Sequence, residues 1–335
     1  MGRRIGMGTS VSREKKTMNH IDVFNGDADG LCALHQLRLA QPVASELVTG
    51  PKREIALVRR VRAAAGDNVT VLDVALEKNI EAVRRLLDAG VRIRYFDHHR
   101  SGELPRHAAF EAHIDTRPEV CTSLLVNDYL GGCHLAWAVV AAFGDNLADS
   151  ARRAASPLGL PESRLDALRE LGEALNYNGY GETLEDLHFA PDELYRRMRP
   201  FADPYAFMAE DDAFTVLRNG YAEDMALARA LQPEQARPAG RIYVLPAQKW
   251  ARRISGVFAN LLANEAPQQA HAVLTARADG GYVVSVRAPL VSPRGADELC
   301  GRFPTGGGRQ GAAGINHLAE GDLAAFVAAF FATYS

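Results

Sequence analysis

The chain has 335 residues, of which 47% are hydrophobic and 24% charged, with 38 basic and 41 acidic side chains. At roughly 100–200 residues per domain, this length predicts two domains and excludes a single small module. A formal net charge of -3 provides no overall positive field for long duplex DNA. Any nucleic-acid partner is therefore expected to be short, or to be held at a local basic site.

The composition also predicts the cellular setting. No window approaches the roughly 18 uncharged apolar residues that span a bilayer, and no apolar segment follows the basic start as in a secretory signal. We therefore expect a cytoplasmic protein without a membrane partner. Residues 1–18 are expected to form a disordered extension, with Met18 as a candidate start. The cysteines lie far apart without a C-x-x-C pair, which predicts reduced thiols: Cys32, Cys121, Cys133 and Cys300.

Short apolar runs alternate with amphipathic segments from residue 20 onward. The runs 21–24, 69–72 and 91–96 predict strands, and the segments 31–40 and 75–89 predict helices. Strand followed by helix followed by strand is typical of a parallel sheet with crossover helices. Helical patterns dominate the middle of the chain, over 121–130, 134–144, 162–175 and about 221–231.

A second αβ unit is predicted after residue 239. Its strands cover 241–246, 271–279 and 281–289, the last two as a pair, and its helices cover 253–265 and 321–334. Residues 176–206 are rich in Tyr, Pro and Gly and predict a hinge. We predict an α/β fold with an N-terminal parallel-sheet domain (19–175), a helical linker (176–238) and a smaller C-terminal domain with a mixed sheet (239–335). A cleft is expected between the two domains.

Aspartates follow three of the predicted strands. Asp27 and Asp29 follow the first, Asp73 follows the second, and Asp97 ends the third. The carboxyl ends of parallel strands meet at one edge of a sheet, where ligands bind, so these side chains should converge. Asp29 or Asp73 alone would more often cap a helix, but capping does not explain all three strand ends together.

Converging carboxylates need a compensating cation, because they repel one another and cannot all stay ionised without one. Oxygen ligands with an imidazole suit Mn²⁺ or Mg²⁺ better than zinc. Pairs of such ions roughly 3.5–4 Å apart stabilise both oxygens of an in-line phosphoryl displacement. The sequence therefore predicts a divalent-ion site, with Mn²⁺ preferred and Mg²⁺ as the alternative, and the resemblance described next implies two such ions.

Four ordered motifs resemble those of the DHH phosphoesterase superfamily: GDADG (26–30), VLD (71–73), FDHH (96–99) and AFGD (142–145). Two later segments resemble the DHH-associated domain of its nanoRNase and RecJ-like branch: SVR (285–287) and GGGRQGAAG (306–314). The resemblance spans about 20 to 330. It implies that 19–175 is the metal-binding catalytic domain and that 239–335 binds the substrate.

The resemblance also implies roles for individual residues. The expected metal ligands are Asp27, Asp29, Asp73, His98 and Asp145, with Asp73 bridging the two ions. Asp97, His98 and His99 are the expected catalytic residues, with Asp97 orienting the imidazoles and His99 near the scissile phosphate. From the residues alone, a protonated His99 could stabilise phosphate charge, although core packing is its alternative, and Asp145 could be a turn residue.

The sequence departs from the family pattern next to the first aspartate. Several branches carry histidine four residues before it, where this chain has Val23. Asn25 lies nearer and could coordinate weakly, bind the substrate or shape the turn. The first metal site is therefore expected to be weaker, or filled only with substrate present. The departure also counts against the inorganic-pyrophosphatase branch, where that histidine belongs to the expected set.

The second domain offers basic and glycine-rich candidates for substrate binding. Arg287 ends a predicted strand, and its planar guanidinium suits bidentate phosphate recognition. Gly306, Gly307 and Gly308 allow close approach of backbone N–H groups to an anion, although a flexible loop is the alternative. Arg309 stands where related sequences have histidine, and we expect it to recognise a terminal phosphate or a guanine edge. The aromatic residues near the hinge either stack on bases or, more commonly, pack: Tyr177, Tyr180, Tyr205 and Phe207.

These features predict a metal-dependent phosphodiesterase that cleaves short linear oligonucleotides or dinucleotides, such as pGpG, to mononucleotides. Within the same superfamily, hydrolysis of cyclic dinucleotides, phosphoadenosine phosphate or polyphosphate and pyrophosphate stays an alternative. A non-catalytic nucleotide sensor is the rival from another class, and a homodimer stays open. RecJ-type action on long strands is disfavoured, because no further nucleic-acid-binding segment follows the glycine motif.

Overall fold

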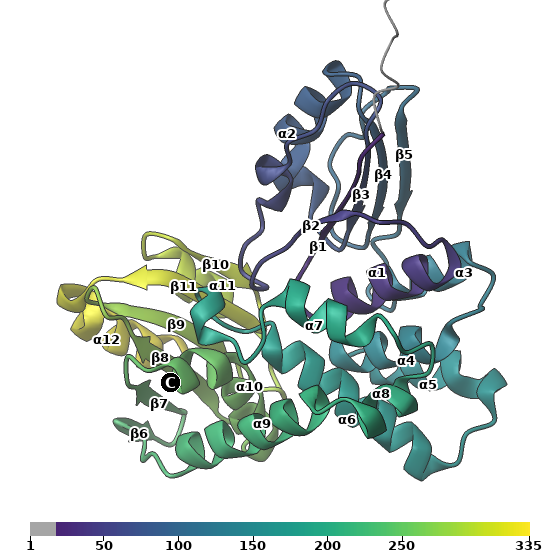
Figure 1. Ribbon diagram of the computed structural model, residues 1–335. Helices are drawn as coiled ribbons and strands as arrows, with labels where there is room; N and C mark the ends of the chain where they lie inside the picture. The colour runs from purple at the N-terminus through teal and green to yellow at the C-terminus, as the bar shows by residue number, and fades with distance from the viewer. Residues whose placement is uncertain (1–17) are drawn as a thin grey trace, which may run out of the picture.

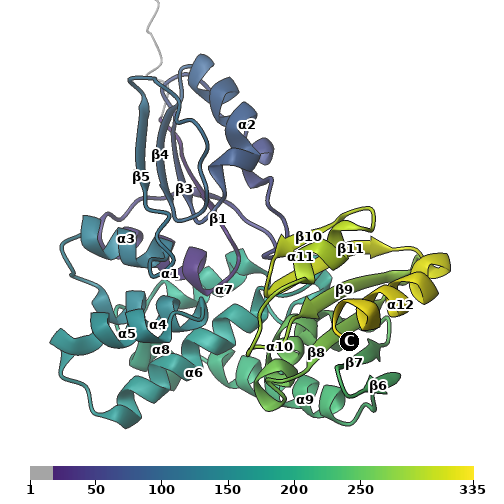
Figure 2. The ribbon, with the colours of Figure 1, turned by 180° about the vertical axis from the view of Figure 1, so that it is seen from behind.

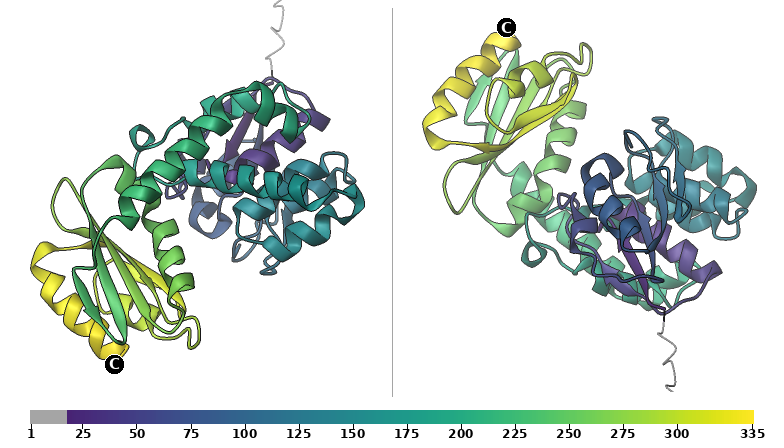
Figure 3. Two further views of the ribbon diagram at one scale, coloured as in Figure 1. Left: turned by 90° about the horizontal axis from the view of Figure 1, so that it is seen from below. Right: turned by 90° about the horizontal axis from the view of Figure 1, so that it is seen from above.

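The computed structural model describes residues 18–335, so the predicted extension lies almost entirely outside the described residues. Two β-sheets lie in separate lobes that are joined through helices (Figures 1 and 3). We call the lobe with the five-stranded sheet the first lobe and the lobe with the six-stranded sheet the second lobe. Within residues 18–335, no helix has both the length and the apolar character required to cross a bilayer.

The first sheet is parallel throughout, as predicted. Its strands are β1 (His20–Phe24), β2 (Glu46–Val48), β3 (Asn68–Leu72), β4 (Arg92–Asp97) and β5 (Phe110–Ile114), in the order β2-β1-β3-β4-β5. The order reverses direction between β1 and β3, which creates the crevice where ligands bind in open α/β sheets. The helices that follow are α1 (Ala28–Ala40), α2 (Leu76–Asp88), α3 (Thr122–Tyr129), α4 (Leu135–Gly144), α5 (Ala148–Ala155), α6 (Glu162–Asn178), α7 (Pro191–Met198), α8 (Pro204–Glu210) and α9 (Ala213–Arg229).

Apolar side chains cover one face of the first sheet and the carboxyl end of the other face. Val23, Val71 and Tyr95 join the apolar cluster beneath α2, whereas Phe24 and Phe96, one residue further on, join the cluster formed with α1, α4 and α6. Helix α2 lies on one side of the strands, and the other helices gather at their carboxyl ends (Figure 2). Residues 189–217 contribute to this second cluster, so the predicted linker helices pack into the first lobe.

The second sheet is mixed, as predicted. It contains β6 (Gln235–Arg237), β7 (Gly240–Leu245), β8 (Ala270–Ala276), β9 (Tyr282–Arg287), β10 (Gly306–Arg309) and β11 (Ala312–Leu318), in the order β10-β11-β9-β8-β7-β6. Its helices are α10 (Lys249–Glu265), α11 (Ala296–Gly301) and α12 (Leu323–Thr333). Helix α10 packs on one face through Phe258, and α12 packs on the other through Phe326 and Phe330.

The glycine segment 306–309 is a strand, which excludes the alternative of a flexible loop. Gly306 to Arg309 pair antiparallel with β11 as the edge strand of the second sheet. Gly308 has φ 148°, and a Cβ on it would lie 2.6 Å from the Cβ of Ala313, so a side chain would collide across the hairpin. The glycines therefore serve the close pairing of two strands in addition to any role toward an anion.

Helix α6 enters the cores of both lobes. Leu168 and Leu171 pack in the first lobe, while Tyr177 joins the cluster of α10 and the second sheet. The hydroxyl of Tyr177 donates to Asp224 of α9, whose carboxylate also accepts two hydrogen bonds from Arg253 of α10, at 2.8 and 2.9 Å. This buried network fixes α6, α9 and α10 to one another.

A second ion pair at the junction makes stability depend on pH. Burial alone would raise the pKa of Asp186. Hydrogen bonds from Arg252 and from the N–H of Glu182 outweigh burial, so the pKa lies below its ordinary value of 3.8. A depressed carboxyl pKa stabilises the fold above the unfolded value, and that contribution disappears as the pH falls through the folded value. We therefore expect Asp186→Asn to lower the urea midpoint at pH 7, with the difference from wild type shrinking below about pH 4. An equal difference at pH 7 and pH 3 would contradict this.

Candidate metal centre

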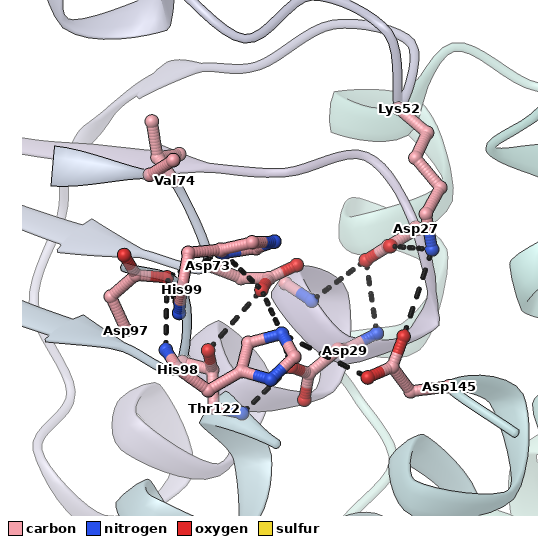
Figure 4. Close-up of polar contacts among 12 residues, drawn as sticks. Asp27, Asp29, Lys52, Asp73, Val74, Asp97, His98, His99, Thr122 and Asp145 are labelled. Carbon is pink, nitrogen blue, oxygen red and sulfur yellow. Dashed lines mark hydrogen bonds and ion pairs between the residues drawn. The ribbon is translucent and has the colours of Figure 1, made fainter. Parts of the chain in front are cut away.

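The predicted aspartates converge at the carboxyl edge of the first sheet (Figure 4). Asp27 and Asp29 follow β1, Asp73 follows β3, and Asp97 ends β4. They lie where the strand order reverses, between β1 and β3. All four side chains are at most 2% exposed, so their charges are held away from water.

His98 lies at the centre of the group. Its Nδ1 donates to the carbonyl oxygen of Val120 at 3.0 Å, which directs Nε2 toward the carboxylates. Nε2 lies 3.3 Å from Asp73, 4.0 Å from Asp29 and 3.8 Å from Asp145. Burial lowers the pKa of His98, but these carboxylates, Asp73 foremost, raise it to about 10. The carboxylates therefore favour positive charge at this position, which a proton on the imidazole or a metal ion would supply.

The N-terminal end of α3 holds Asp29 in place. The N–H groups of Thr122 and Ser123 each donate to one of its oxygens at 2.7 Å. The side chain of Thr122 also donates to Asp73 at 3.2 Å. Two backbone donors and the positive end of a helix stabilise an ionised carboxylate, so Asp29 is well placed as a ligand despite its burial.

Asp73 has an uncommon backbone conformation and a strongly perturbed carboxyl. Its φ is 58°, in the left-handed region that residues other than glycine, asparagine and aspartate seldom adopt. Burial, with the charges of Asp27 and Asp29, raises the pKa of Asp73 well above its usual range. Backbone strain and close like charges at one residue are typical of a site that binds a ligand.

Asp97 orients His99 rather than both imidazoles. One oxygen of Asp97 accepts hydrogen bonds from the N–H of His98 at 2.9 Å, from the N–H of His99 at 3.2 Å and from Nδ1 of His99 at 2.7 Å. Its other oxygen is buried and has no hydrogen-bond partner among residues 18–335. The His99 side chain is 43% exposed, which excludes the core-packing alternative.

Asp27 and Asp145 face a lysine that no sequence motif indicates. Nζ of Lys52 lies 2.6 Å from Asp27 and 3.7 Å from Asp145. Burial lowers the pKa of Lys52, but Asp27, Tyr180 and Asp145 raise it well above its usual range. Burial alone would raise the pKa of Asp27, but Lys52 outweighs burial, so the pKa lies below its ordinary value of 3.8. Burial and the charge of Asp29 raise the pKa of Asp145 to about 6.

Comparisons with known proteins identify the fold. No protein-family model matches the sequence, and no curated protein is significantly similar to it. Three solved structures resemble the chain along nearly its whole length. They are the exonuclease RecJ bound to manganese (18% identity, TM-score 0.62, 93% of this chain and 89% of that one), the DHH domain of a member of the S1p family of ribosomal proteins (15%, 0.61, 94% and 86%) and a pGpG-specific phosphodiesterase from Vibrio cholerae (13%, 0.58, 94% and 99%).

The chain shares the fold of these three structures, one of which is a DHH domain. In this DHH fold the matched motifs form one site: GDADG supplies the turn after β1, VLD ends β3, FDHH ends β4, and Asp145 follows α4. Asp27 also caps α1, accepting hydrogen bonds from the N–H groups of Asp29 and Gly30 at 3.1 Å. The capping role considered for Asp29 and Asp73 therefore belongs to Asp27.

The side chains of the DHH-fold centre fit a divalent metal ion. Three carboxylates, those of Asp29, Asp73 and Asp145, each place an oxygen within 4.0 Å of Nε2 of His98. Asp97 adds a buried oxygen that has no hydrogen-bond partner among residues 18–335. Carboxylates and an imidazole are the ligands that Mn²⁺ and Mg²⁺ accept. Among residues 18–335, two overlapping groups have potential ligand atoms within 4.8 Å of one another: Asp29, His98 and Asp145, and Asp73, His98 and His99. His98 belongs to both, so these residues would hold an ion beside its imidazole. The position beside Asp27 differs, because the ammonium of Lys52 lies there.

The register of the second sheet aligns Arg287 and Arg309 on one face. Arg309 pairs with Ala312, which pairs with Arg287, so the two arginines lie on the same face, about 10 Å apart across two strand spacings. The neighbouring row on that face has only small side chains or none, because it consists of Ser285, Gly314 and Gly307. Ser285 and Gly314 line a cleft of about 740 Å³ together with Arg53 and Glu182 of the first lobe.

The remaining predicted substrate residues differ in their surroundings. Asn25 has a buried side-chain oxygen without a partner among the described residues. Nε of Arg287 donates a hydrogen bond to the side-chain oxygen of Asn260 at 2.6 Å. Burial lowers the pKa of Arg287, and the charge of Tyr180 offsets only part of this effect. Among the four hinge aromatics, Tyr177 and Phe207 are at most 1% exposed and pack in the cores, and Tyr205 contacts Arg164. Of the four, only Tyr180 lies beside Lys52, whose Nζ is 5.7 Å from the centre of the Tyr180 ring.

Removing the hydroxyl of Thr122 tests the support of Asp73. We expect Thr122→Val to weaken Mn²⁺ binding by about tenfold, because partners that orient metal ligands typically contribute 10–100-fold in affinity. Titration calorimetry measures the change. Thr275→Val is the matched control, since Thr275 is 2% exposed and its hydroxyl has no partner among the described residues. Unchanged Mn²⁺ affinity in Thr122→Val would exclude a supporting role.

Proposed function

We propose that this chain is a metal-dependent phosphodiesterase that hydrolyses short linear oligonucleotides or dinucleotides to mononucleotides. The observation that carries the proposal is the convergence of Nε2 of His98 with Asp29, Asp73 and Asp145 at the edge of the first sheet. A divalent ion bound there supplies Lewis-acid stabilisation for the charge that develops on a phosphoryl group. Mn²⁺ is the preferred ion, in keeping with the RecJ structure that contains manganese.

The chain's own residues supply orientation and proton transfer. Arg287 and Arg309 share the face of the second sheet that borders the cleft, and each can bind a phosphate group through a charge-assisted hydrogen bond. Asp97 keeps a proton on Nδ1 of His99, so that Nε2 of this exposed imidazole is available to exchange a proton with the ester.

The volume of the cleft and the net charge of the chain favour a short substrate. The cleft lined by Arg53, Arg277 and Ser285 has a volume of about 740 Å³, within the roughly 300–1,000 Å³ that drug-sized ligands occupy. The net charge of -3 provides no overall positive field for a long strand. We therefore place linear dinucleotides such as pGpG first, the substrate named for the Vibrio cholerae phosphodiesterase with the same fold.

A substrate panel with Mn²⁺ tests the proposed activity. The panel contains pGpG, pApA, longer RNA, a cyclic dinucleotide, phosphoadenosine phosphate and pyrophosphate, with a chelator as the control. We expect GMP from pGpG and no products from longer strands. Pyrophosphate as the sole good substrate would overturn the proposal. Nucleotide binding without hydrolysis, unchanged by Asp73→Ala and Asp97→Ala, would identify a sensor instead.

Arg309 tests how the substrate is recognised. We expect Arg309→Ala to lower kcat/KM for a 5′-phosphorylated dinucleotide by about 10–100-fold, since a hydrogen bond to a charged group contributes roughly 1.5–3 kcal/mol. The unphosphorylated dinucleotide should lose much less. Arg169→Ala is the control, because Arg169 forms only an exposed ion pair with Asp166. Equal losses for both substrates would exclude recognition of the 5′ phosphate.

A further inference from the structure

Lys52 places an ammonium group among the metal-ligand candidates. Besides Asp27 at 2.6 Å and Asp145 at 3.7 Å, its Nζ lies 3.3 Å from the side-chain oxygen of Asn176. An ammonium has three N–H donors, and here three oxygens surround it. Figure 4 shows the side chain of Lys52 reaching into the group from the side of Asp27 and Asp145.

Asp27 already uses both of its oxygens for partners within the chain. One oxygen accepts the N–H groups of Asp29 and Gly30 at the start of α1, and the other accepts from Lys52. Val23, where several branches of the superfamily carry histidine, is fully buried in the apolar cluster beneath α2 and offers no ligand atom. A second metal ion on this side would therefore have to displace the Lys52 ammonium from Asp27, and it would find no donor at position 23.

The backbone holds Lys52 in this place. The loop before it packs on the turn after β1 so closely that a Cβ on Gly26 would lie 2.2 Å from the carbonyl oxygen of Gly50. The N–H of Lys52 donates to the carbonyl oxygen of Gly179 at 2.9 Å. A Cβ on Gly179 would lie 3.0 Å from Asp27. Close packing on two sides fixes the distance from the Lys52 backbone to Asp27.

We propose that the Lys52 ammonium takes the position of a second cation, so that this centre works with one divalent ion and one lysine in place of two ions. Asp145 connects the two positions, because one of its oxygens faces Lys52 and the other faces His98. One divalent ion and one ammonium supply three positive charges to Asp27, Asp29, Asp73 and Asp145. The inference rests on the proposed function only for its catalytic meaning, since metal binding is measured without a substrate.

Metal stoichiometry tests the inference. The number of Mn²⁺ ions per chain is measured by titration calorimetry and by elemental analysis after dialysis, and electron paramagnetic resonance shows whether bound ions are spin-coupled. We expect one uncoupled Mn²⁺ in the wild type. Lys52→Met removes the charge while keeping the length of the side chain, and we expect it to bind two coupled ions. Lys52→Arg should keep one ion, as should the control Lys78→Met, whose lysine is exposed.

Each other outcome overturns the inference. Two coupled ions in the wild type would show that Lys52 yields its place to a metal. A single ion in a folded Lys52→Met variant would show that another feature excludes the second ion. Should Lys52→Met fail to fold, the wild-type count and Lys52→Arg still decide the question. Absence of phosphodiester hydrolysis would overturn the proposed function alone, because the ion count does not depend on turnover.

Discussion

Asp73→Asn is expected to lower kcat for dinucleotide hydrolysis by about 10³-fold. A metal ion that polarises a phosphoryl oxygen contributes several kcal/mol to the transition state, and each 1.36 kcal/mol corresponds to a factor of ten. The amide replaces a charged ligand with a neutral one, so Mn²⁺ affinity should fall as well. Initial rates at saturating substrate, with Mn²⁺ titrated over a wide range, measure both effects.

Asparagine is the appropriate replacement because of the backbone at this position. Asp73 has φ 58°, which asparagine adopts readily, so the variant should keep the turn after β3. It also removes a buried charge next to Asp27 and Asp29, which should raise the melting temperature of the metal-free protein. Asp88→Asn, at the exposed end of α2, is the control. A loss of less than tenfold in kcat, with Mn²⁺ affinity unchanged, would remove Asp73 from the ligand set.

Arg253→Met is expected to destabilise the protein by about 3–5 kcal/mol, the usual effect of removing one partner from a buried ion pair. Arg253 and Asp224 have side chains that are 12% and 5% exposed, and Arg253 also donates to the Tyr177 hydroxyl at 3.0 Å. The variant leaves the Asp224 carboxylate buried without its counter-ion. Urea unfolding followed by circular dichroism measures the loss.

A double variant separates the lost interaction from the uncompensated charge. Arg253→Met combined with Asp224→Leu removes both charges, and it should recover most of the stability lost in the single variant. The Tyr177 hydroxyl keeps its contact with Nε2 of His188 at 2.9 Å in either case. A double variant as unstable as Arg253→Met alone would show that the hydrogen bonds themselves, rather than the charge of Asp224, stabilise the junction.

The strands and helices that could be predicted are those with strong periodic patterns. Runs such as 69–72, buried on both faces of a parallel sheet, have continuous apolar sequence and were identifiable as strands. The strands β2 and β5 could not be predicted from the sequence. They are the two edge strands of the first sheet, and most of their residues are half-buried or exposed. The segment 306–309 has no apolar side chain at all, and its strand exists only through pairing with β11.

The candidate site shows the same division. Asp27, Asp29, Asp73, Asp97 and His98 could be grouped because strand ends share an edge. Their individual tasks could not, because a capping hydrogen bond, such as that of Asp27, depends on local backbone angles. Lys52 lies in a loop without periodicity, and only the packing of that loop against the turn after β1 brings its ammonium to the carboxylates.

Helix α6 fixes the distance between the two lobes. It is anchored by Leu168 in the first lobe and by Tyr177 in the second, and between these anchors it is a continuous rigid element. Asn176, one residue before the second anchor, contacts Lys52. The distance between the candidate metal centre and the arginine row is thus set by a continuous helix. On the proposed function, we expect this fixed distance to favour ligands of one phosphate-to-phosphate length.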